Sequence, residues 1–551
     1  MVKRTLKFAC AVLALGLVLV ACGEGEDPEA PDAADPGVDE EPGEEPGEDP
    51  EDEGATPADR GGHVTVATVR EPESLGADFA CTATFGLVSR QVLEALVQRD
   101  PVTNELAPEL ATEWEQIDEL TWEFTIREGV EFHDGSPLNA ESVAGSLNYI
   151  WDPDGEEIRC QQFAQPDFEA VAVDEYTVRM DLASPEPTFD MLMWLIPIQS
   201  YEQIQQAENL AELQQNPIGT GPYVFEEWNR GQSIELSAND NWWGSEDPDG
   251  LGDVSFDAAS FIIRPDAQSR IAAVEAGEAD VGERLPRDPC VSALGDNCLQ
   301  QPGIDTAMLR MDHNSEIMGD NRIREAIALA VDKQAIADAI IGGVPAALLV
   351  PPGSVGYSDN IDVYPHDPDR ARELVEEARE DGVPIDNGIE FVIEAEKFAG
   401  IGEAQEAIAA MLRDVGLEVS IDVREPAVFS EEWSNPERPI SSERNMMVLH
   451  QHSNRFSDFQ ATAESYYLCD GRLSTYCNEE FDELMARGSE MSGQERHETF
   501  SEAVDIAYEE FAFVPVVHMD LFTGISERLV WFNDGQRPDS WLFLKELSFS
   551  S

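Results

Sequence analysis

Two histidines and an arginine lie close together in the segment 446–459 and could act on a bound molecule. His450 and His452 are two positions apart, so both side chains would leave a strand on the same face. Imidazole nitrogens bind nickel and zinc, but no third histidine follows nearby, and we therefore expect no metal site. Arg455 would bind a carboxylate or phosphate of a solute, or would pair with the neighbouring Asp458.

The sequence lacks the motifs of the common nucleophilic and metal-dependent hydrolases. It contains no Gly-x-Ser-x-Gly elbow and no His-Glu-x-x-His zinc motif. The stretch 216–223 contains Gly219-Thr220-Gly221, but neither a phosphate loop nor a dinucleotide fingerprint is complete there. These glycines instead indicate a tight turn that delivers the chain into a strand. We therefore expect a protein without catalytic residues or cofactor, and a secreted hydrolase is the alternative.

The amino terminus has the layout of an exported lipoprotein. Three basic residues precede an apolar run that ends at Ala21 and is shorter than the roughly 20 residues of a membrane span. The sequence Leu-Val-Ala-Cys-Gly at 19–23 resembles a bacterial lipoprotein box. We expect residues 1–21 to be removed and Cys22 to be acylated, which would tether the chain to the extracytoplasmic face of a membrane. The alternative is an ordinary buried cysteine of the apolar run.

Residues 22–60 have the composition of a disordered stalk. From Gly23 to Arg60 the chain has 17 acidic residues, a single basic one and no aromatic residue. Such a segment buries too little apolar surface to fold, and its charges repel one another. The alternative is an acidic patch that captures a cation or a basic partner.

The acidic excess extends over the whole chain. With 112 acidic and 34 basic residues, the formal net charge is −78. This balance excludes nucleic acid as a partner, because nucleic-acid binding requires many Lys and Arg side chains on phosphates. Salt would screen the mutual repulsion of the carboxylates. We therefore infer a protein adapted to saline surroundings.

Cysteine usage favours disulfides. Six cysteines lie outside the signal, and an even number in an exported chain indicates disulfides rather than a metal site. They are Cys81, Cys160, Cys290, Cys298, Cys469 and Cys477. The last four form two pairs with eight-residue spacing in turn-rich sequence, which could close local loops and would leave the first two for each other.

The pattern of apolar residues predicts alternating strands and helices in the remaining chain, whose length of about 490 residues predicts two or three domains. The predicted strands are 63–69, 121–126, 390–395, 418–423 and 511–517, and the predicted helices are 89–97, 323–341, 368–380 and 404–415. The order strand, helix, strand between 390 and 423 predicts an α/β unit with a right-handed crossover. Asp134-Gly135 indicates a turn in which His133 is hydrogen-bonded.

A series of motifs resembles the extracytoplasmic solute-binding proteins of family 5, the peptide and nickel type that serves ABC importers. The motifs are LAPELATEW at 106–114, FTIREGVEFHDGSPLNAESV at 124–143, PIGTGPY at 217–223, NDNWWG at 239–244, AGEADV at 276–281 and RIREAIALAVDK at 322–333, followed by 367–378. They occur in the family's order and cover nearly all of residues 62–551.

The resemblance implies a two-lobe α/β periplasmic-binding-protein fold of class II, with an extra domain inserted into the first lobe. The implied parts are lobe I at 62–99, 216–305 and 520–551, the inserted domain at 100–215, and lobe II at 306–519. It also implies a membrane-anchored, monomeric binding component of an ABC importer. This component would close over an oligopeptide or peptide-like solute and deliver it to the permease. The alternative solutes are nickel or a metal chelate, and an oligosaccharide.

Peptide binders of this family meet the free amino group of the peptide with an aspartate in a Trp-x-x-Asp-Tyr-x-Asp-Pro segment. Here Asp458 matches the second aspartate, but Ser453 or Asn454 stands in place of the first. Either the solute lacks a free ammonium group or another carboxylate supplies this contact. A turn role for Ser74 is an open alternative to ligand binding. The expected ligand-binding residues are Glu73, Ser74, His450, Gln451, His452, Asn454, Arg455 and Asp458.

Overall fold

The computed structural model covers most of the chain after the stalk. It describes residues 61–78, 80, 83–103, 105–150, 167–246, 253–426, 428–429, 445–454, 456–471, 473–532 and 541–550. The predicted signal, the predicted stalk and the residues Cys22, Cys81, Cys160 and Arg455 lie outside these ranges. No helix within the described ranges is both long enough and apolar enough to cross a membrane.

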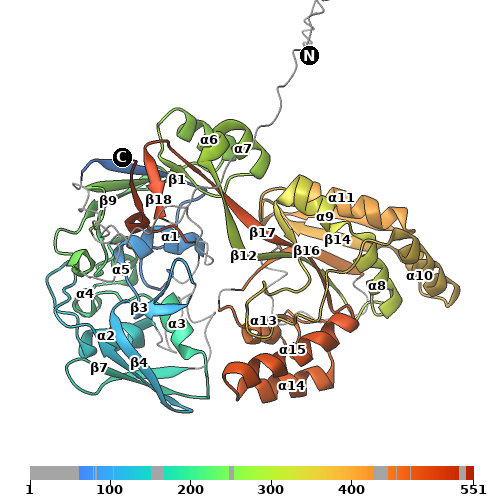
Figure 1. Cartoon of the computed structure of the whole chain (residues 1–551), viewed down its shortest axis with the longest axis horizontal. Helices are drawn as coiled ribbons and strands as arrows, with labels where there is room; N and C mark the ends of the chain where they lie inside the picture. Colours follow the sequence, from blue (N-terminus) through green and yellow to red (C-terminus); the bar gives the residue numbers. More distant parts are fainter. Residues whose placement is uncertain are drawn as a thin grey trace, which may run out of the picture. The chain divides into compact units, whose positions relative to one another are not determined.

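One mixed sheet of 11 strands runs through the described chain (Figure 1). The strand order is β15-β14-β16-β12-β17-β11-β1-β10-β9-β8, and β13 pairs with β17 outside this path. The bounds are β1 His63–Thr68, β8 Tyr223–Asn229, β9 Ser233–Ala238, β10 Ala258–Ile263, β11 Val281–Gly282, β12 Cys298–Met311, β13 Gly343–Pro345, β14 Ile389–Glu394, β15 Val419–Arg424, β16 Met446–Ser453 and β17 Phe513–Ile525.

The long strands β12 and β17 join the two parts of this sheet. They pair antiparallel from Cys298 beside Gly524 to Arg310 beside Phe513, and the register shifts between Pro302 and Thr306. Gly303 lies in this irregular stretch, where an added Cβ would stand 2.3 Å from the carbonyl oxygen of Met519. A side chain there would separate the two strands, so glycine is needed for their close approach.

The first part of the sheet shares a hydrophobic core with a smaller sheet of order β4-β5-β7-β6. Asn148 of the helix α2 binds this sheet at both its amide atoms, donating to the carbonyl of Ala170 and accepting from its N–H, each at 2.8 Å. The bounds are β4 Ala111–Asp118, β5 Thr121–Ile126, β6 Phe168–Ala172, β7 Thr177–Leu182, α2 Ala140–Ile150, α3 Phe189–Leu195, α4 Tyr201–Gln206, α5 Leu210–Gln215, α6 Ala267–Glu275 and α7 Arg287–Leu294.

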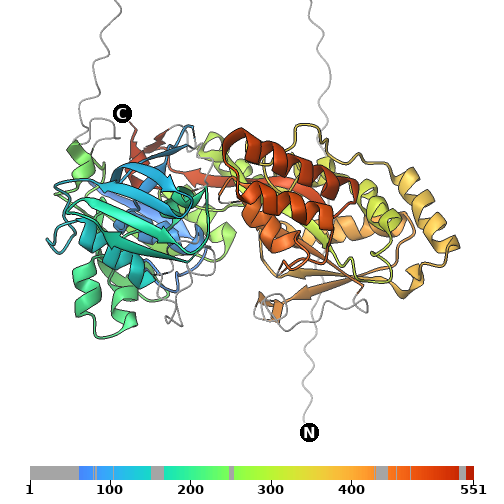
Figure 2. The ribbon, with the colours of Figure 1, turned by 90° about the horizontal axis from the view of Figure 1, so that it is seen from below.

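Helices cover both faces of the second part of the sheet. Leu309 of β12 belongs to a core formed with α8, α10 and α11, whereas its neighbour Met308 points to the core under α13, α14 and α15. Figure 2 shows α14 and α15 lying against each other. The bounds are α8 Asn321–Ala330, α9 Lys333–Ile336, α10 Pro368–Glu380, α11 Ile401–Asp414, α13 Phe459–Tyr466, α14 Glu479–Ser489 and α15 Gly493–Glu509.

The predicted helix 368–380 is confirmed as α10. It begins at Pro368, and the side chain of Asp367 accepts a hydrogen bond from the backbone N–H of Arg370, which satisfies a donor of the first turn. The predicted strands 390–395 and 418–423 correspond to β14 and β15, which pair in parallel on either side of α11 in the sequence.

The predicted single helix 323–341 is wrong. α8 ends before Val331, which adopts an extended conformation, and Asp332 caps a new helix by accepting from the N–H of Ala335. The buried ammonium of Lys333 turns back and donates to the carbonyl of Ala328 at 2.7 Å. These hydrogen bonds satisfy the polar groups at the break. The apolar residues keep the same spacing on both sides of the break, so the sequence pattern does not reveal it.

The predicted helix 89–97 begins and ends too late, because α1 spans Ala83–Val92. Beyond it, the N–H of Ala95 donates to the carboxylate of Glu109 at 2.8 Å, and β2 (Val97–Arg99) pairs with β3 (Leu106–Pro108). The predicted strand 511–517 is longer in the structure, because β17 stays paired with β12 and then with β11 up to Ile525.

The last residues of the chain bind to α1. Gln91 donates to the carbonyl of Leu542 and accepts from the N–H of Leu544, each at 2.9 Å. Nearby, β18 (Leu529–Trp531) pairs with β19 (Leu547–Phe549). In the structure, disulfides join Cys290 to Cys298 and Cys469 to Cys477.

Candidate functional site

The two histidines singled out in the sequence lie on β16 and contact protein side chains. His450 is buried and its ring stacks on Phe429 with 5.8 Å between ring centroids. Burial and the nearby charge of Lys397 hold the pKa of His450 well below its usual value of 6.5. His452 shares a 2.8 Å hydrogen bond with the hydroxyl of Thr462. The described residues include no group of three or more side chains placed to hold a metal ion.

The polar residues at the end of β16 bind it to neighbouring segments. Gln451 and Ser453 both donate to the carboxylate of Asp305 on β12. The side-chain amide of Asn454 donates to the hydroxyl of Ser354 at 2.9 Å. In this structure these groups hold the protein together next to the strands that join the two parts of the sheet.

Asp458 forms a buried ion pair with Arg496 of α15. Its carboxylate lies 2.9 Å from Nε of Arg496, and both side chains are only 2% exposed. The same carboxylate accepts the N–H of Gln460 at 2.8 Å and thereby caps α13. Asp458 is therefore paired within the protein, with a different arginine from the Arg455 considered from the sequence.

The candidates after β1 differ in exposure. Glu73 is exposed, whereas Ser74 is buried. The hydroxyl of Ser74 donates to Asp78 at 3.1 Å and accepts the N–H of Gly76 at 3.0 Å, which is the arrangement of a serine in a turn. None of the predicted ligand-binding residues that the structure describes lines the pocket that follows.

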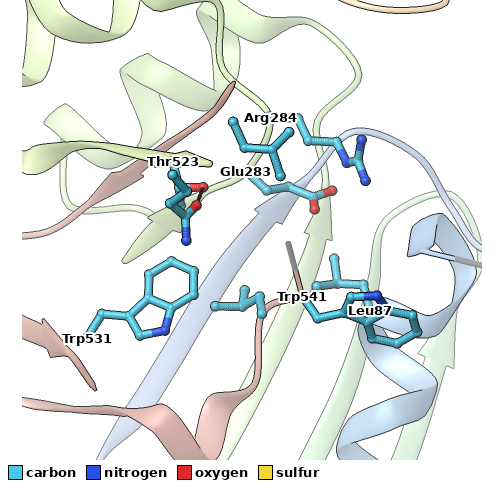
Figure 3. A pocket seen from close by; sticks show the side chains of 9 residues that line it. Leu87, Glu283, Arg284, Thr523, Trp531 and Trp541 are labelled. Atoms are coloured by element: carbon cyan, nitrogen blue, oxygen red, sulfur yellow. Dashed lines mark hydrogen bonds between the residues drawn. The ribbon is translucent and has the colours of Figure 1, made fainter. Parts of the chain in front are cut away.

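An enclosed pocket lies at the carboxyl ends of the parallel strands β1 and β11 (Figure 3). Ligands of open α/β sheets bind in the crevice outside such strand ends. The lining of the pocket comes from α1, the loop after β11, both joining strands and the carboxyl-terminal segment: Leu87, Glu283, Arg284, Gln301, Leu521, Thr523, Trp531, Trp541 and Leu542. The cavity that these residues enclose has a volume of about 30 Å³.

The polar side of the pocket is built around Glu283. One oxygen of its carboxylate accepts from the hydroxyl of Thr68 at 2.5 Å and from the N–H of Val69 at 3.1 Å. Both donors belong to the end of β1, so the carboxylate is held in place. Across the pocket, Thr523 donates to the side-chain oxygen of Gln301 at 3.0 Å.

Arg284 follows Glu283 with a backbone φ of 49°, in the left-handed region that costs a residue with a side chain on the order of 1 kcal/mol. Strained residues of this kind cluster at ligand sites. Its partly buried guanidinium forms no hydrogen bond, ion pair or ring contact with the residues that the structure describes. Among the arginines and lysines that the structure describes, it alone lacks such a partner.

Two indoles form the apolar side of the pocket. Trp531 is 3% exposed and donates to Glu546 at 3.3 Å. Trp541 is 5% exposed and packs edge-on against Trp194, with 5.8 Å between ring centroids. Figure 3 shows both indoles on the opposite side of the pocket from Glu283 and Arg284.

The sequence offered one signal for this site. Glu283 and Arg284 directly follow the strand that ends the AGEADV motif, and residues at the carboxyl end of such a strand face the ligand crevice. Trp531 and Trp541 could not have been found in this way, because they lie more than 200 residues away and reach the pocket through the tertiary fold.

Comparison with known proteins matches the chain to one family. The sequence model of "Bacterial extracellular solute-binding proteins, family 5 Middle" matches residues 105–469. Heme-binding protein A of Haemophilus influenzae is 26% identical over 81% of this chain and 85% of its own length. The dipeptide-binding protein of Escherichia coli is 30% identical over 56% of this chain and 62% of its own length. Di/tripeptide-binding protein 2 of Pseudomonas aeruginosa is 26% identical over 83% and 90%.

Solved structures share the fold. The ABC transporter substrate-binding protein CtaP of Listeria monocytogenes superposes with a TM-score of 0.77 at 20% identity, over 89% of this chain and 100% of its own. DppA of Helicobacter pylori, in complex with the peptide STSA, gives a TM-score of 0.71 at 20% identity, over 89% and 99%. The two-lobe α/β fold expected from the sequence motifs is thereby confirmed.

Proposed function

Because the chain belongs to the bacterial extracellular solute-binding proteins of family 5, we propose that it is the peptide receptor of an ABC importer. The receptor captures an oligopeptide or peptide-like solute and delivers it to a membrane permease as a monomer. The observation that carries the proposal is the match of the family model to residues 105–469. The relatives named as dipeptide-binding and di/tripeptide-binding proteins support peptides as the solute class.

Capture takes place by hinge closure between lobe I (62–99, 216–305 and 520–551) and lobe II (306–519). The hinge is the irregular stretch of β12 around Gly303, together with its partner β17. A hinge of a few residues that absorb the backbone change is the usual device in two-lobe receptors. The inserted domain (100–215) and lobe II are in contact, because Gln460 donates to Glu186 at 3.3 Å.

The receptor is anchored to the extracytoplasmic face of the membrane by lipid on Cys22, and the acidic segment 22–60 separates the lipid from the lobes. In a bacterial host, the full-length protein partitions with the membrane fraction, and Cys22→Ala moves it to the soluble fraction. Membrane association that persists in the Cys22→Ala variant contradicts the lipid anchor.

Calorimetric titration of the full-length protein in detergent tests the solute class. Di-, tri- and pentapeptides are compared with hemin, nickel and an oligosaccharide, and the peptides are recovered afterwards for mass spectrometry. One equivalent of intact peptide bound per chain is expected. Peptide fragments after incubation would indicate a hydrolase, and binding of hemin, nickel or sugar without peptide would replace the proposed solute.

A further inference from the structure

Glu186 lies between β7 and α3 and is shared between the inserted domain and lobe II. Its carboxylate is buried, and Oε1 accepts from the N–H and the hydroxyl of Thr188 at 3.0 and 2.6 Å within the inserted domain. The other oxygen, Oε2, accepts from the side-chain amide of Gln460 of α13 in lobe II. Glu186 and Gln460 are 274 positions apart, so this hydrogen bond links parts of the chain that only the tertiary fold brings together.

The backbone on both sides of Glu186 is stiff. Pro185 and Pro187 flank it, and each proline ring fixes its own φ. A residue before a proline is restricted to extended conformations, and Glu186 stands in that position. Its carboxylate therefore loses little conformational freedom when it binds a partner, which makes the hydrogen bond more effective.

The orientation of Gln460 is fixed from within lobe II. Its side-chain oxygen accepts from the guanidinium of Arg496 at 2.6 Å, so its amide nitrogen faces the other way. That nitrogen donates to Glu464 at 2.9 Å as well as to Glu186. Arg496 is itself buried and held by the carboxylate of Asp458. Gln460 thus connects a buried guanidinium to the carboxylate of Glu186, and hydrogen bonds in such a chain strengthen one another.

Charges of both signs meet at this contact. Burial raises the pKa of Glu186, and the positive charge of Arg496 opposes this rise, so the guanidinium attracts the carboxylate. The carboxylates of Asp458 and Glu464 repel that of Glu186. The amide of Gln460 donates to both Glu186 and Glu464, and it thereby holds together two groups that otherwise repel each other.

We propose that Glu186 and Gln460 form a latch that holds the two lobes closed on the solute, with Arg496 as the positioning residue of Gln460. The proposal rests on the function proposed above, because hinge closure brings these two side chains together. The inserted domain shares a hydrophobic core with lobe I, so the latch holds lobe I through it. A contact made only in the closed state slows opening, so it slows release of the solute and leaves the capture rate unchanged.

Hydrogen exchange of the backbone amides detects the latch from the opposite lobe. The full-length protein in detergent is exchanged alone and with saturating trialanine, and mass spectrometry follows the segments 183–195 and 456–466. Gln460→Ala is expected to increase exchange at least about twofold in 183–195, although the substitution lies in lobe II. A purely structural role of Gln460 within lobe II would change exchange only in 456–466.

An exchange of the two side chains tests the hydrogen bond itself. Glu186→Gln keeps an oxygen for Thr188 but turns a second amide toward that of Gln460, so two donors face each other. Gln460→Glu instead turns a carboxylate toward that of Glu186. Each change is expected to speed release of trialanine about three- to tenfold, measured by stopped-flow tryptophan fluorescence. The double variant Glu186→Gln/Gln460→Glu restores one donor and one acceptor, so its release is expected to be slower than in either single variant.

Gln494→Ala is the matched control. Gln494 of α15 is exposed and donates to Glu498 at 3.0 Å, four positions further along, as Gln460 does to Glu464. We expect this change to leave both the exchange in 183–195 and the release of trialanine as in the wild-type protein. Circular dichroism monitors folding of each variant.

The latch and the peptide receptor fail separately. If Gln460→Ala leaves exchange in 183–195 unchanged with and without trialanine, the latch is overturned and peptide binding by the wild-type protein still supports the receptor. A double variant that releases trialanine as fast as the faster single variant also overturns the latch, because a hydrogen bond between the two positions then plays no part. If the wild-type protein binds no peptide, the peptide receptor falls. Increased exchange in 183–195 without solute then supports the latch, and unchanged exchange overturns it.

Discussion

Glu94 is a buried acid whose surroundings explain part of the PIGTGPY motif. Its carboxylate accepts from the hydroxyl of Thr220 at 2.8 Å and from the indoles of Trp242 and Trp243 at 3.0 and 2.7 Å. Burial, with the nearby carboxylate of Glu109, raises the pKa of Glu94 to about 7. Thr220 thus belongs to a buried network that joins two of the sequence motifs.

The raised pKa of Glu94 predicts a stability that depends on pH. The folded pKa of about 7 lies above the reference value of 4.5, so the protonated carboxyl favours folding. The stabilisation that Glu94 contributes is fully present below pH 4.5 and is lost as the pH rises through 7. Denaturant unfolding between pH 4.5 and 8 should therefore show a decline on the order of 3 kcal/mol from this group. Glu94→Gln should flatten the decline, and the exposed Glu490→Gln should retain it.

The ion pair between Asp458 and Arg496 predicts a structural role for Asp458. Asp458→Asn leaves the guanidinium of Arg496 buried without its counter-charge, which should cost about 3–5 kcal/mol in the free energy of unfolding. Urea unfolding measures this loss, and Arg496→Gln together with Asp458→Asn should cost less than the two single changes added. If the Asp458→Asn variant keeps its stability but loses affinity for peptide, Asp458 binds the ligand and its role is not structural.

Asp458 also shows what could be predicted at the level of single residues. The motif placed it near the solute, but its partner lies 38 residues further along on another helix. Pairing between side chains so far apart leaves no trace in a single sequence. The turn at His133 was predictable from Asp134-Gly135, but the hydrogen-bond partners of His133 were not: its N–H donates to the carbonyl of Gly219, and its ring bonds with the carbonyl of Gly221, 88 residues further along.

The turn before β8 depends on two glycines that approach the end of α1. A Cβ at Gly219 would lie 2.1 Å from the carbonyl oxygen of Val92, and a Cβ at Gly221 would lie 2.7 Å from the same atom. The N–H of Gly221 donates to that carbonyl at 3.0 Å. The predicted turn that leads into a strand is confirmed, and the structure explains why both positions need glycine.

Gly219→Ala should therefore lower the free energy of unfolding by about 1–3 kcal/mol, because the new methyl group overlaps a backbone oxygen that cannot move without shifting α1. Gly402→Ala is the matched control. Gly402 lies within α11 with no atom near its would-be Cβ, so alanine should stabilise the helix by about 0.5–1 kcal/mol. Denaturant unfolding of both variants measures the contrast, and equal effects would contradict this account of the turn.

An element was predictable where the spacing of apolar residues and a capping residue indicated the same start, as at α10. It was not predictable where polar groups interrupted a helix. Asp332 and Lys333 end one helix and begin another, yet both fit the surface pattern of a continuous helix. The physical reason is that the break is satisfied by hydrogen bonds between groups close in sequence, which hydrophobic periodicity does not register.

The charge of the whole chain predicts a dependence on salt. With a formal charge of −78, mutual repulsion of carboxylates opposes the compact state, and added salt shortens the reach of that repulsion. The melting temperature should rise by several degrees between low and molar potassium chloride. Sucrose of equal osmolality separates charge screening from general exclusion effects. A melting temperature that stays constant or falls with salt contradicts the adaptation to saline surroundings.

The family and the two-lobe α/β fold were predictable because the motifs occur in order along most of the chain, and the family match confirms them. The pocket was not, because its lining comes from positions between Leu87 and Leu542 that only the paired strands β12 and β17 bring together. Neighbouring residues in a sequence predict local turns, helices and strands. They do not predict a pocket whose lining residues come together only when the whole sheet has formed.

The attachment of the last residues to α1 has a consequence for the order of assembly. Residues 306–519 begin and end at neighbouring points of the sheet, where Thr306 pairs with His518, and they form a hydrophobic core of their own, so we expect this stretch to fold without the last residues of the chain. The amino-terminal part of the fold is completed last, because Gln91 of α1 forms hydrogen bonds with Leu542 and Leu544 at the other end of the sequence. The pocket is therefore complete only once the last residues are in place, and a chain truncated before Trp531 lacks the lining residues Trp531, Trp541 and Leu542.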